Sequence, residues 1–397
     1  MHLPSARVYQ EMRSEEASLW YVPANDGKEL ALHIKCPTSC IKALLAGCSL
    51  KLVYGKNGFH LCTGGRILDM PDAPIFLSRV QREAEEHSAL VRALNDRKFP
   101  AFLFNELDAC VAWTNVELAI EDASKALQFI GDETQLYVGS FESETSHSLD
   151  CFCFSVDDTN TYPNAKTIPT VEISVSLEPW RTNHISYVGL RGYQTITLND
   201  KDEGEMLERA VWASLESVFP LTLYKSPQVR TGVKIRELTD VLSFHEYGNF
   251  LIEAKDLSVL QAGYERGQER RTKSTQKQVK KAIKQLVGAS KALKRGESVI
   301  DTNGSELQID RTKSDHCIIL VTELMHCGDW SEIEDLLVKA MRATGAFFNL
   351  LDLREFIALL KGSSGKATLL DYNLMQRCKV FAENGSIHIR SQRAPNP

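Results

Sequence analysis

Hydrophobic positions in the second half of the chain follow two periods, one typical of buried strands and one typical of an amphipathic helix. Residues 241–244 and 250–252 are short apolar runs joined through residues 245–249, which predicts a β-hairpin. Downstream, apolar residues recur at helical spacing at Val279, Ile283, Leu286, Val287 and Leu293. This spacing predicts a helix over residues 272–295, ending near Gly296.

The same pattern divides the rest of this half into alternating elements. A helix is predicted over residues 203–218, and four strands are predicted over residues 221–224, 239–244, 250–255 and 317–323. Residues 301–305 read as a hairpin turn before the last of these strands. Beyond it, helices at 331–344 and 353–361 flank a strand at 347–351.

The first half also mixes strands with helical patterns. Strands are predicted at residues 20–22, 30–34, 52–54, 59–61, 170–177 and 184–190, with a helix at 78–95 and a turn at 56–58. We therefore expect an α+β domain over residues 1–200 and a second domain over 201–390. The boundary falls in the polar stretch 198–202, and residues 391–397 are expected to be a loose tail.

Two carboxylates and an ammonium group are predicted to converge at one end of the 241–252 hairpin. Alternation along a strand places Glu253 and Lys255 on one face and Ala254 on the other. Asp240 begins the first strand, so pairing brings it near Glu253 at the end of the second. Such a pair suits Mg²⁺ or Mn²⁺, and the lysine suits a role in phosphodiester hydrolysis. The alternative is a surface ion pair worth less than about 1 kcal/mol.

A basic segment follows this motif directly. Residues 255–295 contain twelve Lys and Arg against three acidic residues, although the whole chain has a formal net charge of −6. The predicted helix therefore has a cationic outer face, which is either solvated or tracks a phosphate backbone. The residues expected to contact nucleic acid are Arg270, Arg271, Lys273, Lys277, Lys280, Lys281 and Lys284. Gln285 lies within the apolar run and is expected to reach the active site from beside the sheet.

Residues 203–325 resemble the PD-(D/E)xK nuclease superfamily, whose restriction-endonuclease-like core is a helix, three strands, a helix and a strand. The resemblance implies an α/β core of this αβββαβ order, preceded by the α+β N-terminal domain. It assigns the motif aspartate to Asp240, the second acid to Glu253 and the lysine to Lys255. Thr239 replaces the proline of the motif.

Further site residues follow from the same resemblance. Glu237 matches an acidic position that often precedes the aspartate, and the first helix commonly supplies another glutamate to the metal. Glu208 or Glu205 is the candidate for that glutamate. The implied metal ligands are thus Asp240, Glu253 and Glu208.

Composition agrees with an intracellular globular enzyme. No apolar stretch approaches the roughly 20 residues of a membrane-spanning helix, so no membrane partner is expected. The N-terminus lacks a secretory pattern, and ten cysteines are scattered without a compact framework, which favours reduced thiols and the cytoplasm.

Several other motifs are discounted. Cys36, Cys40, Cys48 and Cys62 fit no familiar zinc spacing, and buried thiols are expected instead. Cys151 and Cys153 alternate as in a strand. Residues 362–366 lack the full phosphate-loop spacing, which favours a loop between helices. His316 and His326 flank a buried strand, where structural roles are expected.

Two classes of function remain. The favoured one is a Mg²⁺-dependent nuclease acting on double-stranded DNA as an endonuclease, a build that in prokaryotes often serves in defence against phage or foreign DNA. The alternative is a catalytically silent nucleic-acid-binding or interaction protein that retains the fold. The N-terminal domain is expected to recognise the target, a partner protein or a second copy of the chain.

Overall fold

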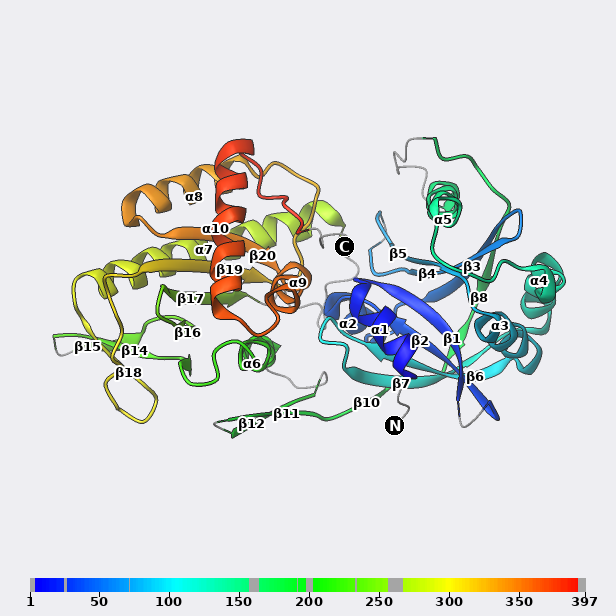
Figure 1. Ribbon diagram of the computed structural model, residues 1–397, viewed down its shortest axis with the longest axis horizontal. Helices are drawn as coiled ribbons and strands as arrows, with labels where there is room; N and C mark the ends of the chain where they lie inside the picture. The colour runs from blue at the N-terminus through cyan, green and yellow to red at the C-terminus, as the bar shows by residue number, and fades with distance from the viewer. Residues whose placement is uncertain are drawn as a thin grey trace. The chain divides into compact units, whose positions relative to one another are not determined.

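The chain folds into two compact units of mixed helix and strand, as the sequence pattern predicted. The computed structural model describes residues 4–24, 27–70, 72–156, 164–190, 192–197, 203–232, 234–255 and 267–391. The first unit comprises Met1–Asn183 with Val259–Gly267, and the second comprises His184–Ser258 with Gln268–Pro397 (Figure 1). Each unit is described by itself.

The first unit contains two sheets. One has the order β1 (Ser18–Ala24), β2 (Glu29–Lys35), β6 (Lys98–Phe104), β7 (Cys110–Glu117) and β10 (Arg181–Thr182), with β9 (Ser176–Leu177) also paired to β7. The other has the order β5 (Ile75–Gln81), β4 (His60–Ile67), β3 (Leu50–Asn57) and β8 (Thr170–Ser174). Within the first sheet only β2 and β6 are parallel; the other pairs are antiparallel.

The helices of this unit are α1 (Ala6–Ser14), α2 (Thr38–Leu45), α3 (Ala84–Asp96), α4 (Ile120–Ile130) and α5 (Ser143–Val156), with a 3₁₀ turn at Glu133–Gln135. Two sequence predictions were wrong here. The helix predicted from residue 78 begins at Ala84, because residues 78–81 complete strand β5. Cys151 and Cys153 lie in α5 rather than in a strand, since a short apolar run does not distinguish the two.

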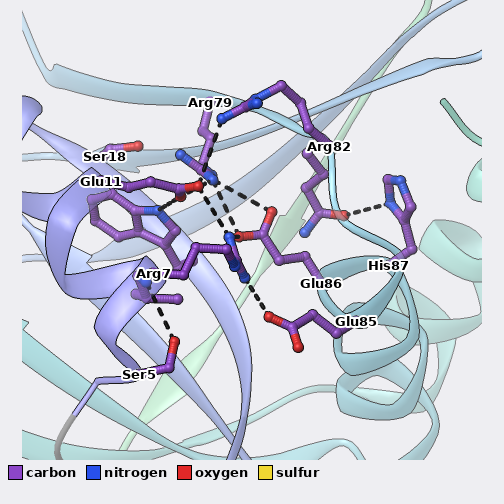
Figure 2. A network of polar contacts seen from close by, with 12 residues as sticks. Ser5, Arg7, Glu11, Ser18, Arg79, Arg82, Glu85, Glu86 and His87 are labelled. Atoms are coloured by element: carbon purple, nitrogen blue, oxygen red, sulfur yellow. Dashed lines mark hydrogen bonds and ion pairs between the residues drawn. The ribbon is translucent and has the colours of Figure 1, made fainter. Parts of the chain in front are cut away.

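A network of charged side chains joins α1 to β5 and α3 (Figure 2). The guanidinium group of Arg79 contacts the carboxylates of Glu11 and Glu86, and Arg7 reaches Glu11 at 3.0 Å and Glu86 at 3.3 Å. Burial alone would raise the pKa of Glu11, but Arg79 and Arg7 outweigh it and lower that pKa. For Glu86 burial prevails and the pKa is raised. The network therefore fastens the N-terminal helix to the unit.

The second unit is built on one five-stranded sheet. Its order is β13 (Leu223–Lys225), β16 (Val241–Phe244), β17 (Gly248–Lys255), β19 (Ser314–Val321) and β20 (Phe347–Asp352). The first three strands pair antiparallel, whereas β17, β19 and β20 are parallel. All eight residues of β19 except the first are buried, which matches the continuous apolar run of a strand covered on both faces.

Helices surround this sheet. They are α6 (Glu203–Leu215), α7 (Gln268–Lys294), α8 (Ser331–Thr344), α9 (Leu353–Ser363) and α10 (Ala367–Asn384). Helix α7 packs on β17 and β19 and contacts α8, while α6 contacts α9. Strand β19 connects to the antiparallel hairpin through α7, so the chain order is helix, three core strands, helix and strand.

Two smaller strand groups accompany the core. A three-stranded sheet has the order β15 (Lys234–Glu237), β14 (Gln228–Thr231) and β18 (Ser298–Ile300), and a hairpin pairs β11 (Ile185–Gly189) with β12 (Gly192–Ile196). We expected the boundary between domains at residue 200, but the structure divides the chain at Asn183 and His184. The hairpin belongs to the second unit because β11 and β12 contact α6.

The discounted motifs take structural positions. Cys36, Cys40, Cys48 and Cys62 are buried. Of residues 362–366, the first two end α9 and the other three connect it to α10. The His316 ring is fully buried between the rings of Phe250 and Phe347 and contacts Asp371. The predicted linker 198–202 and tail residues 392–397 lie outside the described residues.

Candidate active site

The β16–β17 hairpin positions the three residues that the sequence singled out. Val241 pairs with Ile252, so Asp240 lies beside the end of β17 where Glu253 and Lys255 project. The hydroxyl group of Thr239 donates a hydrogen bond of 2.7 Å to the backbone carbonyl of Ile252, which holds the chain entering β16 against β17. The predicted convergence of Asp240, Glu253 and Lys255 is present.

The ammonium group of Lys255 lies between the two carboxylates. Its Nζ atom is 2.6 Å from Oε2 of Glu253 and 3.3 Å from Oδ2 of Asp240. The backbone N–H of Ala254 also donates to Oδ2 of Asp240 at 2.7 Å. Only 7% of Asp240 and 1% of Glu253 are exposed, so this cluster is far more buried than a surface ion pair.

Burial and like charge make Glu253 hard to ionise. Burial, followed by the charge of Asp240, raises the pKa of Glu253 to about 7, although Lys255 acts in the opposite direction. Burial also disfavours the charged form of Lys255, but Glu253 and Asp240 outweigh it and raise the pKa of Lys255. One ammonium group thus leaves part of the negative charge of the two acids uncompensated.

Glu208 and Glu237 lie in the electrostatic surroundings of this cluster. Glu208, on α6, is half-buried and has a raised pKa, caused by burial first and then by the charges of Asp240 and Glu237. Its carboxylate is 3.9 Å from Nζ of Lys225. Glu237 is exposed at the end of β15. Neither residue shares the contacts that join Asp240, Glu253 and Lys255.

Two further predicted site residues, Gln285 and Glu205, lie on helices α7 and α6. Gln285 lies on α7, the helix that packs on β17, and its Oε1 atom is buried with no hydrogen-bond partner in the described part of the chain. The side chain of Glu205 lies outside the described residues, although its backbone is part of α6.

Two carboxylates, those of Asp240 and Glu253, are the protein groups through which this site fits a small hard cation. Across the described residues, no group of three or more His, Cys, Asp or Glu side chains is gathered closely enough to hold a metal ion. The predicted trio of Asp240, Glu253 and Glu208 is thus not assembled. However, Mg²⁺ characteristically takes one or two protein carboxylates and fills its other positions with water and substrate phosphate. Asp240 and Glu253 meet that requirement.

The basic residues predicted to contact nucleic acid all lie on α7. This helix carries nine Lys and Arg against one acid, Glu269. Lys273 is paired with Glu269 and Lys280 with Glu332, both at 2.5 Å. The exposed residues Lys277, Lys281 and Lys284 follow one another at helical spacing. They form a cationic stripe on the outer face of α7.

Sequence reasoning missed a second group of charged residues at the same edge of the sheet. Asp352 ends β20 and is bound by Arg390 through two contacts of 2.8 and 2.6 Å. The signal was available, because Asp352 directly follows the predicted strand at 347–351, and the carboxyl ends of parallel strands are where α/β sheets bind ligands.

The comparisons with known proteins assign no family. Neither a protein-family model, nor a curated protein, nor a solved structure matches the chain. Of the helices that the structure describes, none has both the length and the apolar character needed to cross a membrane.

Proposed function

We propose that the second unit is a Mg²⁺- or Mn²⁺-dependent nuclease that hydrolyses phosphodiester bonds, with double-stranded DNA as its preferred substrate. The observation that carries the proposal is the buried contact of Lys255 with both Asp240 and Glu253 at the end of one hairpin. Two buried carboxylates that share one ammonium group are costly to maintain for stability alone.

The order of elements supports the same function. Helix α6, strands β13, β16 and β17, helix α7 and strand β19 follow one another as in the αβββαβ core of the nuclease superfamily that the sequence resembles. The small strands β14, β15 and β18 are additions between these elements. Asp240 immediately precedes the second core strand, and Glu253 and Lys255 lie on the third.

Each residue has a role that its position permits. Asp240 and Glu253 would hold the cation, which supplies Lewis-acid stabilisation of the phosphate when bound. Lys255 would position the attacking water or stabilise charge on a phosphate oxygen, since its ammonium group lies at the same carboxylates. The cationic stripe on α7 would hold the nucleic-acid backbone through counterion release.

A second candidate is a protein that binds nucleic acid without cleaving it. The observation that favours it is that two rather than three carboxylates converge at Lys255, within the residues described. In this candidate, the basic residues of α7 still bind nucleic acid, but the β16–β17 hairpin does not catalyse hydrolysis.

Incubation of the purified protein with supercoiled plasmid, linear duplex, single-stranded DNA and RNA, with Mg²⁺, Mn²⁺ or EDTA, tests the proposal. We expect metal-dependent cleavage of duplex DNA that Glu253→Gln abolishes. Glu246→Gln is the matched control, because Glu246 is an exposed acid in the turn of the same hairpin. Cleavage that persists in EDTA or in Glu253→Gln would refute the assignment. Binding without cleavage under every condition would favour the second candidate.

A further inference from the structure

A second cluster of ionisable groups lies on the same edge of the sheet as Lys255. Strand register pairs Lys255 with Val321 and Val321 with Asp352. Adjacent strands are about 4.8 Å apart, so the backbones of Lys255 and Asp352 are separated by roughly 10 Å. A nucleic-acid strand that places one phosphate at Lys255 has its neighbouring phosphates within that range.

Two guanidinium groups surround the single carboxylate of Asp352. Arg390 contacts it through both oxygens, and NH2 of Arg354 lies 3.6 Å from Oδ2. The side chain of Asp352 is fully buried, whereas 30% of Arg390 remains exposed. The neighbouring carboxylate of Glu355 is engaged by Arg377 at 2.8 Å. Three guanidinium groups, those of Arg354, Arg377 and Arg390, therefore meet the two buried carboxylates of Asp352 and Glu355.

Two histidines extend the cluster toward solvent. The rings of His326 and His388 lie 5.0 Å apart, and the ring of Trp330 packs edge-on against His388 at 6.0 Å. His326 is exposed, while Nδ1 of His388 is buried without a hydrogen-bond partner in the described residues. These side chains come from the loop after β19 and from the segment after α10, which meet at this edge.

Burial and the charges that face the two rings both shift the pKa values of His326 and His388. His326 faces Arg390, Arg354, Asp352 and Glu323, and His388 faces His326 and Arg390, with Glu334 bound to the backbone N–H of Ile387. Burial, and then the charge of Arg390 and Arg354, lowers the pKa of His326. Burial, and then His326 and Arg390, lowers the pKa of His388. Burial and neighbouring positive charge thus both disfavour protonation of the two rings, and a bound anion would offset the positive charge.

We infer that His326 and His388, together with Arg390 and Arg354, form a phosphate-binding subsite that holds the nucleic-acid backbone beside the hairpin of Asp240 and Glu253. The inference rests on the proposed function for the identity of the ligand. Apart from the buried Nδ1 of His388, the rings supply up to three N–H donors once protonated, and the guanidinium groups supply fixed charge. Because phosphate favours the protonated rings, binding takes up protons and strengthens as pH falls.

Titration of the histidine ring protons of the full chain by NMR tests the subsite without any cleavage. Inorganic phosphate is the probe, in EDTA, with chloride at equal ionic strength as the reference. We expect phosphate to raise the pKa of His326 and His388 and to leave that of His184 unchanged, since His184 is an exposed histidine in the β11–β12 region. Equal behaviour of all three histidines would overturn the inference.

Oligonucleotide binding identifies the source of the phosphate. In EDTA, we expect a short duplex to bind about tenfold more tightly at pH 5.5 than at pH 8, and His326→Gln with His388→Gln to remove most of that difference. His184→Gln is the control. Equal affinity for duplexes with and without 5′-phosphates assigns the site to the backbone; a requirement for the terminal phosphate overturns that assignment. Neither experiment requires cleavage, so a negative result in them can be distinguished from a failure of the nuclease proposal.

Discussion

At Glu253, burial and the charge of Asp240 act together against ionisation, and Lys255 opposes them. Its pKa of about 7 exceeds the ordinary value of 4.5, so the folded chain binds more protons than the unfolded chain between these two values. The free energy of unfolding therefore falls as pH rises through this window. A divalent cation at the same carboxylates would reverse that trend by replacing the proton.

Substitution of Glu253 by Gln should remove this pH dependence. In EDTA, we expect the wild-type chain to lose on the order of 2 kcal/mol more stability than Glu253→Gln between pH 5 and pH 8. Urea unfolding at both pH values measures the difference. Identical losses in the two proteins would show that Glu253 ionises in the folded state as readily as in the unfolded state.

The role proposed for Lys255 predicts that its substitution will separate metal binding from turnover. An ammonium group is no metal ligand, so Lys255→Ala should retain Mg²⁺ or Mn²⁺ affinity at pH 8 while losing about 10²-fold or more in cleavage rate. Calorimetric titration with Mn²⁺ and a plasmid assay give the two readings. Lys313→Ala, which removes a partly exposed lysine paired with Asp310, serves as the control. Loss of metal affinity together with activity would contradict the assigned role.

The sequence was sufficient for the hairpin site and insufficient for the phosphate subsite, for a physical reason. Asp240, Glu253 and Lys255 lie within one hairpin, so strand alternation and one turn determine their meeting. His326, Asp352 and His388 come from three segments that meet only through packing around the sheet. The position of Glu208 likewise depends on how α6 packs.

Helix α7 is the element on which nucleic-acid binding is predicted to depend. We expect Lys277→Gln, Lys281→Gln and Lys284→Gln together to weaken binding to all sequences alike. The slope of log K against log salt should become shallower by up to about three, because each phosphate contact contributes about −0.9 for duplex DNA. Fluorescence anisotropy across a salt series measures the slope.

The control for this experiment removes the same number of charges elsewhere. Lys28, Lys125 and Lys379 are exposed lysines outside α7, and their joint replacement by Gln should leave the slope nearly unchanged. If both triple variants behave alike, the effect reflects net charge and the stripe on α7 has no special role.

Two arginines, Arg79 of β5 and Arg7 of α1 itself, attach helix α1 to the unit. Arg79→Leu would remove the buried guanidinium group that contacts both Glu11 and Glu86 and leave them the contacts of Arg7, which we expect to cost about 3 kcal/mol. Glu86→Gln should cost less, because the amide oxygen still accepts hydrogen bonds from the arginines and no buried carboxylate charge has to be compensated. Urea unfolding, followed by the fluorescence of the buried Trp20, compares the two variants. Equal losses would show that the network is not organised around Arg79.

Periodicity succeeded best where an apolar pattern is sustained, and it missed one long helix as well as several short strands. The predictions for α7, α8 and β20 agree closely with the structure, since each has a sustained apolar pattern. Strands β14, β15 and β18 have three or four residues each and were not predicted. Helix α10 could have been found, because Leu370, Leu374, Cys378 and Phe381 repeat at helical spacing and are buried.

At the scale of the whole molecule, the division into two units has a thermodynamic consequence. Each unit has its own sheets and its own buried residues, so calorimetry should resolve two unfolding transitions. Arg79→Leu should lower the midpoint of one transition, and saturating Mn²⁺ should raise the midpoint of the other. A single transition shifted by both changes would show that the chain unfolds as one cooperative body.

The β16–β17 hairpin also bears on the order in which the chain folds. Residues 240–255 make their contacts over a short sequence separation, whereas the parallel pairing of β17 with β19 must wait for α7 to form and close a long crossover. Contacts of low sequence separation form early because little loop entropy is lost. The acid pair therefore arises with Lys255 as a counter-ion that belongs to the same hairpin, and refolding needs no metal to bring Asp240 and Glu253 together.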